Sequence, residues 1–173
     1  IPPDSGSHGV LIKTFDRAER PDLAWELVEH ADRHNTPLGV VPHSMLIKLF
    51  GHANQPDRCL AVFDRMTSLG IDPTVVTYSS LIKAMGDADQ PGRAIDAFEA
   101  LRGSELEPNV VVYNTVIKAL GDAGRDEHAE EVYRQMREDG VAPDVVTFST
   151  LIQAFGRAGK PDAAWRMLDE MET

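Results

Sequence analysis

Cysteine, aromatic residues and positive charge are all scarce in this sequence. A single cysteine among 173 residues excludes an internal disulfide framework. No apolar run approaches the roughly 20 residues that a membrane-spanning helix needs, so we expect no membrane span. Lys and Arg number 17 against 28 Asp and Glu, and the net charge is −11 at pH 7. Proteins that bind nucleic acids usually neutralise phosphates with basic residues, so this balance counts against a nucleic-acid ligand.

What the sequence does contain is repetition. A block of 35 residues occurs five times end to end, and the fifth copy is cut short. The copies occupy residues 5–39, 40–74, 75–109, 110–144 and 145–173. A fixed period of this size predicts a solenoid, in which each repeat packs mainly against its neighbours. We therefore expect a single array over residues 1–173, with a degenerate first repeat.

Each block contains two helical patterns. The first has the i, i+3, i+4, i+7 apolar spacing of a helix with one buried face. In the fourth block these residues are Tyr113, Val116, Ile117 and Leu120. The second pattern opens with proline, which the first turn of a helix tolerates, at Pro21, Pro56, Pro91 and Pro161. It also carries a column of small residues in which Cys59 replaces Ala, which predicts close packing and a buried thiol. These patterns predict about ten helices in pairs and no strands.

The repeats resemble the pentatricopeptide repeat family. The resemblance rests on the period, on the openings Val-Val-Thr-Tyr-Ser at 75–79 and Val-Val-Val-Tyr-Asn at 110–114, and on the Pro-Asn and Pro-Asp endings. The tetratricopeptide repeat is the nearest alternative, but its Trp-x-x-Leu-Gly pattern is absent. The resemblance implies an all-α fold, a right-handed α-solenoid superhelix of about five helix-turn-helix repeats with a concave face.

The resemblance also implies a ligand, single-stranded RNA, with two or three side chains of each repeat reading one base. In the family, the fifth and last residues of a repeat contact the base edge, and the second residue packs against base faces. Carried onto this chain, the base-recognition residues are Ser44, Thr74, Ser79, Asn109, Asn114, Asp144 and Ser149. The base-packing residues are Val41, Val76, Val111 and Val146.

Three recognition pairs are complete in the sequence: Ser44 with Thr74, Ser79 with Asn109, and Asn114 with Asp144. The family pattern suggests adenine for the second pair and uracil for the third, and it does not decode the first. An amide both donates and accepts hydrogen bonds, and a carboxylate accepts them, which suits base edges. The first repeat offers only Gly9 and Gly39, and Ser149 has no closing residue.

A row of basic residues recurs at the ninth position of the repeat, at Lys13, Lys48, Lys83 and Lys118. These positions lie four residues after the recognition position and seven after the packing position, so they share a helix face with both. Together with Arg157, the lysines are candidates for contacts to backbone phosphates. The alternative is that exposed helix positions carry lysine for solubility.

Two observations favour a different function. Asp87 and Asp122 occupy the thirteenth position, where the family often has a basic residue, and a carboxylate there would repel phosphate. Thr74, Asn109 and Asp144 are also good helix caps, so the fold alone accounts for them. The alternative is a protein-binding scaffold, a subunit of a large organellar assembly. If the two aspartates dominate the groove beside the valines, the scaffold interpretation is favoured.

No motif predicts catalysis, a cofactor, a metal or a small-molecule substrate. His30 and His34 are four residues apart, but the glutamate that follows the first histidine of a zinc-protease helix is absent. We therefore expect a binding protein and not an enzyme. The family resemblance implies an organellar location, chloroplast or mitochondrion, and a role in RNA processing, stability or translation.

Overall fold

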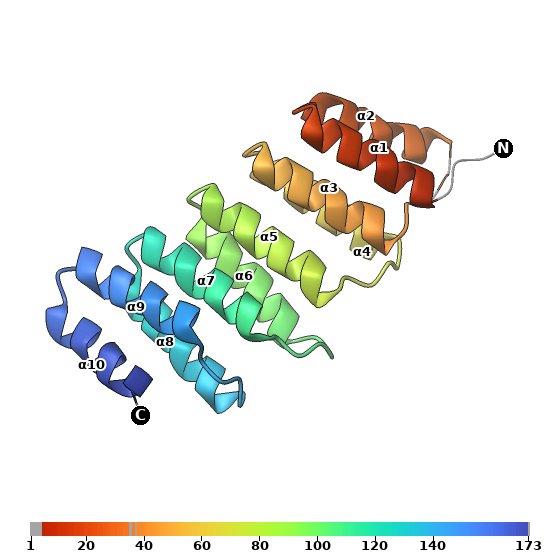
Figure 1. Ribbon diagram of the computed structural model, residues 1–173. Coiled ribbons are helices and arrows are strands. Elements are labelled where there is room, and N and C mark those ends of the chain that lie inside the picture. The colour runs from red at the N-terminus through yellow and green to blue at the C-terminus, as the bar shows by residue number, and fades with distance from the viewer. Residues whose placement is uncertain (1–4, 35, 37, 173) are drawn as a thin grey trace.

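The computed structural model describes residues 5–34, 36 and 38–172, so residues 1–4, 35, 37 and 173 of the predicted array lie outside it. In the described part there are ten α-helices and no strand, as the apolar spacing predicts. The first helices of the five pairs are α1 (Ser5–Arg17), α3 (Val40–His52), α5 (Val75–Asp87), α7 (Val110–Asp122) and α9 (Val145–Arg157). The second helices are α2 (Pro21–Arg33), α4 (Pro56–Ser68), α6 (Pro91–Arg102), α8 (Asp126–Glu138) and α10 (Pro161–Glu172). Each odd-numbered helix packs against the next one, so these helices run side by side along the array (Figure 1).

Local signals in the sequence explain where the helices begin. Four of the second helices start at the recurring proline. A backbone N–H in the first turn of a helix has no partner within the helix, so proline, which has no N–H, loses no hydrogen bond there. Thr74, Asn109 and Asp144 cap α5, α7 and α9, and each side chain accepts a hydrogen bond from the backbone N–H three residues on. The capping function of these residues is therefore confirmed.

A seam of small residues sets how closely the odd-numbered helices approach. Gly51, Gly86 and Gly121, at the twelfth position of their repeats, face the alanine at the tenth position of the next repeat. A β-carbon added to Gly86 would lie only 2.6 Å from the Ala119 Cβ, so alanine does not fit there without a shift of the helices. A β-carbon added to Gly156 meets nothing within 4 Å.

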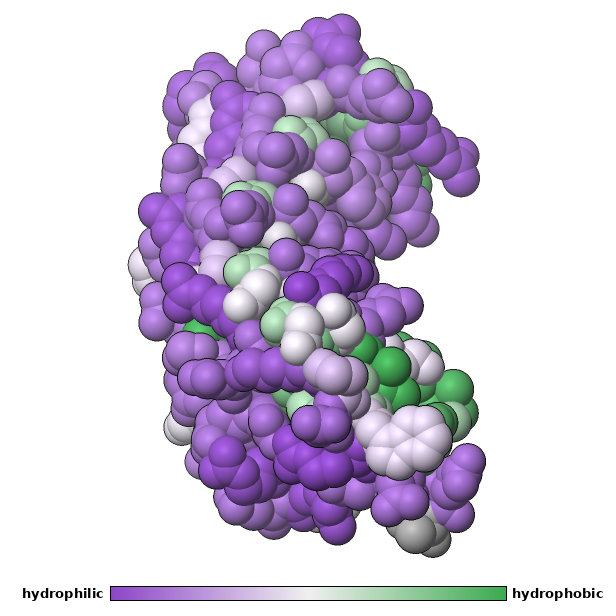
Figure 2. Space-filling view, turned by 90° about the vertical axis from the view of Figure 1, so that its left-hand side faces the viewer, coloured by the Kyte–Doolittle hydropathy of each residue, from purple (hydrophilic) through white to green (hydrophobic). Residues whose placement is uncertain are grey.

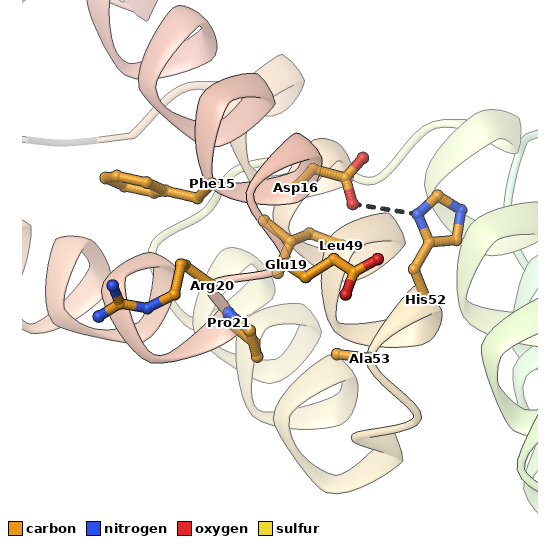
Figure 3. A pocket seen from close by; sticks show the side chains of 8 residues that line it. All are labelled: Phe15, Asp16, Glu19, Arg20, Pro21, Leu49, His52 and Ala53. Atoms are coloured by element: carbon orange, nitrogen blue, oxygen red, sulfur yellow. Dashed lines mark hydrogen bonds and ion pairs between the residues drawn. The ribbon is translucent and has the colours of Figure 1, made fainter.

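The seam is interrupted between the first two repeats. Asp16 stands at the glycine position, and Leu49 stands at the alanine position opposite it. Both residues line a cavity of about 340 Å³ between the C-terminal ends of α1 and α3. His52 Nδ1 and Asp16 Oδ1 lie 3.1 Å apart at its edge, while Arg20 points away from them (Figure 3). The degenerate first repeat thus differs from the others in packing as well as in sequence.

The apolar columns form one continuous core between the two layers of helices. Cys59 belongs to this core; it is fully buried, its Sγ lies 3.3 Å from the Ile47 carbonyl oxygen, and burial raises its pKa to about 12. The predicted buried thiol is confirmed. Seen from the C-terminal end, the array is curved and hollowed on the side of the odd-numbered helices (Figure 2). None of the described helices combines the length and apolar character needed to cross a bilayer.

Candidate nucleic-acid interface

A groove runs across the exposed face of α5, α7 and α9. It has a volume of about 360 Å³, and its lining includes a recognition pair, Asn114 and Asp144, with Val111 and Val146. Lys83 and Lys118 lie along the same groove. A second, smaller groove of about 230 Å³ repeats the arrangement one step earlier, with Lys48, Val76 and Ser79 in its lining. The two grooves thus bring together part of the set that the repeat pattern selected. The linings do not include Lys13, Val41, Ser44, Thr74, Asn109 or Ser149.

The valine row is exposed although its residues are apolar. Val41, Val76, Val111 and Val146 are 56–67% exposed. They project from the first turn of α3, α5, α7 and α9, whereas the apolar residues one and two turns further along these helices are mostly buried in the core. Four repeated, exposed valines contribute nothing to the core, so their role lies at the surface. An exposed apolar side chain can cover the face of an unstacked base.

Asn114 and Asp144 form a connected pair. The Asn114 Nδ2 donates to Asp144 Oδ1 at 3.0 Å, and Asp144 Oδ1 also accepts from the Thr147 backbone N–H at 2.9 Å. These bonds, that of the Thr147 backbone first and that of Asn114 next, lower the pKa of the Asp144 carboxyl, so this group is ionised at neutral pH. The pair therefore presents an amide and a carboxylate side by side.

The other predicted recognition residues lie on the same face but differ in their contacts. Ser44 Oγ donates to the Val40 carbonyl at 3.1 Å and lies 2.7 Å from Thr77 Oγ1. Asn109 caps α7, and Ser79 makes no side-chain hydrogen bond within the described part of the chain. Ser149 is exposed on α9, and Gly9 and Gly39 offer no side chains, as expected.

The lysine row is exposed, but ion pairs neutralise part of it. Lys83 Nζ lies 2.5 Å from Asp87 Oδ2, and Lys118 pairs with Asp122. Asp122 also accepts from Arg157 of the next repeat at 2.5 Å. Lys118 first and Arg157 second lower the pKa of the Asp122 carboxyl, so this group is ionised and both cations are partly compensated. The lining of the groove over α5, α7 and α9 carries three carboxylates, Asp87, Asp122 and Asp144, against two lysines, so acidic side chains outnumber basic ones there.

In the first two repeats the basic residues are less compensated. Lys13 and Lys48 form no ion pair with any of the described residues. The five odd-numbered helices together carry six Lys and Arg against three Asp and Glu, a net charge of +3. The chain as a whole carries −11, so the acidic excess lies in the even-numbered helices and the loops. The overall charge is therefore a poor guide to the charge of this face.

Sequence reasoning missed Thr77 and Thr147, the third residues of their repeats. Both are fully buried, and both hydroxyls contact a recognition residue of the preceding repeat. Their recurrence at one position was the available signal, but threonine near a helix start is common enough to pass as a cap. Elsewhere, His30 and His34 stack at 4.3 Å between ring centroids, and the described residues contain no group of three potential metal ligands.

Comparison with known proteins decides the family. The profile of the PPR repeat family matches residues 38–87, 108–157 and 143–173, and the PPR repeat profile matches residues 76–106. This chain belongs to the PPR repeat family. No curated protein matches this chain.

Solved structures show the same fold. The maize PPR protein PPR10, in complex with an 18-nt psaJ RNA element, superposes with a TM-score of 0.78 and 25% identity over 99% of this chain and 29% of that protein. The PPR domain of Arabidopsis thaliana protein-only RNase P 1, in complex with tRNA, gives 0.79 and 18% over 92% of this chain and 84% of that domain. Nuclear proteinaceous RNase P 2 of A. thaliana superposes with a TM-score of 0.81 and 18% identity, over 98% of this chain and 38% of that protein. The chain thus spans less than a third of PPR10.

Proposed function

We propose that this PPR chain binds single-stranded RNA along its odd-numbered helices, with about one base for each repeat. The groove over α5, α7 and α9 carries the proposal, because it brings two exposed valines, a recognition pair and two lysines together. PPR10 and the PPR domain of RNase P 1 were each solved with RNA, which supports RNA as the ligand class. The net charge of +3 on the odd-numbered helices supports it as well, whereas the lining of the groove itself has a net charge of −1.

We infer that this groove takes a uracil. A flat base can lie between Val111 and Val146, with its edge toward the Asn114 amide and the Asp144 carboxylate. Asn114 Nδ2 uses one of its two protons toward Asp144, so the second can donate to a uracil carbonyl. The ionised Asp144 can accept from the ring N–H. Ser79 and Asn109 would read an adenine one repeat earlier.

The mechanism is passive binding, with no covalent step. Bases would lie against the valines while the backbone follows the lysine row, where phosphates would compete with the Asp87 and Asp122 carboxylates for the cations. Four usable repeats read about four bases, so further repeats or partners are needed for a unique target. We extend the proposal to organellar transcripts, with a role in their processing, stability or translation, on the strength of the family resemblance.

Binding of a fluorescent octanucleotide, adenine–uracil set in cytidines, tests the proposal. Asn114→Ala removes the amide that faces the base and should weaken binding about three- to tenfold, the value of one or two hydrogen bonds. Thr67→Ala, at the exposed end of α4, is the matched control and should leave binding unchanged. Absence of binding by the natural chain, even at low salt, would overturn the proposal. It would leave the groove to a protein segment whose basic side chains pair with Asp87 and Asp122.

A further inference from the structure

We propose that the third residue of a repeat is a specificity-determining residue, because its hydroxyl orients the recognition pair of the preceding repeat. This inference rests on the proposed RNA-binding function. Two repeats have threonine there, Thr77 and Thr147, whereas a third has Val112. The chain therefore contains oriented and unoriented recognition pairs side by side, and the same position separates them.

Thr147 lies at the centre of one pair. Its Oγ1 is 2.6 Å from Asn114 Oδ1 and 3.0 Å from Asp144 Oδ1, and it accepts from the Asp144 backbone N–H at 3.1 Å. Because Thr147 is fully buried, water does not replace these contacts. Thr147 thus contacts both members of a pair that belongs to the preceding repeat.

The contacts select one orientation of the Asn114 amide. With Oδ1 toward the Thr147 hydroxyl and Nδ2 toward Asp144, the Asn114 amide accepts from the hydroxyl and donates to the carboxylate. A flipped amide would place its carbonyl oxygen against the ionised Asp144 carboxylate. The hydroxyl therefore helps to hold the amide with one N–H available to a base, and this avoids an ordering cost when RNA binds.

Thr77 repeats the arrangement at the Ser44/Thr74 pair. Its Oγ1 lies 2.7 Å from Ser44 Oγ and 3.1 Å from Thr74 Oγ1, and it accepts from the Thr74 backbone N–H at 3.1 Å. The Ser44 proton goes to the Val40 carbonyl, so the Thr77 hydroxyl donates to Ser44 as the Thr147 hydroxyl donates to Asn114. Two pairs of different composition are thus each contacted by a threonine hydroxyl from the third position of the next repeat.

Val112 provides the internal contrast. It is as deeply buried as the two threonines, but it has no hydroxyl. Asn109 still caps α7 through the Val112 backbone N–H at 3.2 Å, whereas Ser79 lacks any side-chain hydrogen bond within the described residues. The Ser79/Asn109 pair is consequently not braced.

Three variants test the inference. Thr147→Val removes the hydroxyl while keeping the shape, Thr147→Ser restores it, and Val112→Thr adds it where it is missing. Each is titrated with the adenine–uracil octanucleotide and with octanucleotides that carry guanine in place of the uracil or of the adenine. Thr147→Val should reduce the preference for uracil over guanine about fivefold, and Thr147→Ser should keep it within about twofold. Val112→Thr should sharpen the preference for adenine at the neighbouring position.

A measurement without RNA separates this inference from the proposed function. In NMR spectra, the Asn114 side-chain amide protons should exchange slowly with solvent in the natural chain and in Thr147→Ser, and faster in Thr147→Val. Unfolding midpoints confirm that each variant is folded. If the natural chain binds no RNA, the proposed function fails, and the amide spectra alone show whether Thr147 holds Asn114. Unchanged spectra in Thr147→Val, or RNA binding with unchanged base preference, would overturn the inference.

Discussion

Releasing the lysines from their aspartates should strengthen RNA binding and steepen its salt dependence. Asp122 contacts two cations, Lys118 and Arg157, and all three side chains are 42–65% exposed. Asp122→Asn therefore frees two positive charges beside the groove and removes one negative charge. Because exposed ion pairs stabilise a fold by only about 0–1 kcal/mol, folding should be little affected.

The size of the effect follows from counterion release. Each cation that neutralises a phosphate of a single strand adds about −0.7 to the slope of log K against log salt, or roughly a fivefold gain at 0.1 M salt. Two freed cations should therefore steepen the slope by about 1.4 and raise affinity roughly ten- to thirtyfold at 0.1 M salt. Adding Asp87→Asn frees Lys83 as well and should bring the change in slope to about 2.

Fluorescence anisotropy of the labelled octanucleotide across a tenfold range of KCl measures both quantities. Asp57→Asn is the matched control, because it changes the net charge equally and removes an ion pair of 2.7 Å between repeats, to Arg93, on the even-numbered helices. That variant should leave the slope unchanged. An equal effect of Asp57→Asn and Asp122→Asn would mean that only overall charge matters, and no change in slope for Asp122→Asn would refute the reasoning.

Three further predictions concern packing, protonation and the valines. Gly86→Ala forces its new β-carbon to 2.6 Å from Ala119 and should lower the free energy of unfolding by about 1–3 kcal/mol in urea titrations, whereas Gly156→Ala, which meets nothing within 4 Å, should be neutral or slightly stabilising; equal effects would contradict the seam. Burial lowers the pKa of His43, and the Arg65 guanidinium 2.9 Å from its Nε2 adds to the shift, so the folded state binds this proton less readily than the unfolded state. The free energy of unfolding should therefore be highest above pH ~6.5 and fall as pH drops below it, and His43→Gln should weaken that dependence. Val111→Ala should weaken RNA binding about fivefold, by loss of apolar contact with a base, without a change in salt slope; an unchanged affinity would remove the valines from the interface.

Local chemistry made the helices predictable from sequence. Proline starts a helix and an Asn or Asp side chain caps one regardless of what packs nearby, so Pro56 and Asn109 mark helix boundaries without tertiary information. The exposure of the valine row was equally predictable from sequence, because the position of these valines relative to the buried stripe follows from helical spacing. The periodicity then extended each local inference to every repeat.

Contacts between repeats were harder to predict. The Lys118–Asp122 pair follows from a spacing of four residues, but the contact from Asp122 to Arg157 depends on how adjacent helices are offset. The same holds for the contact from Thr147 to Asn114, 33 residues apart. The net charge of the chain was a poor guide to the charge of the odd-numbered helices for a related reason. Composition does not show that most acidic residues lie on the even-numbered helices and the loops.

The most direct test of the central claim is a map of where single-stranded RNA touches the chain. Methyl spectra of the valines, recorded during titration with the adenine–uracil octanucleotide at low salt, report the exposed valine row and the even-numbered helices in one experiment. We predict shifts at Val41, Val76, Val111 and Val146, and none at Val28 or Val62, which are buried in α2 and α4. Spectra that do not change, or that change only on the even-numbered helices, would contradict RNA binding in this groove.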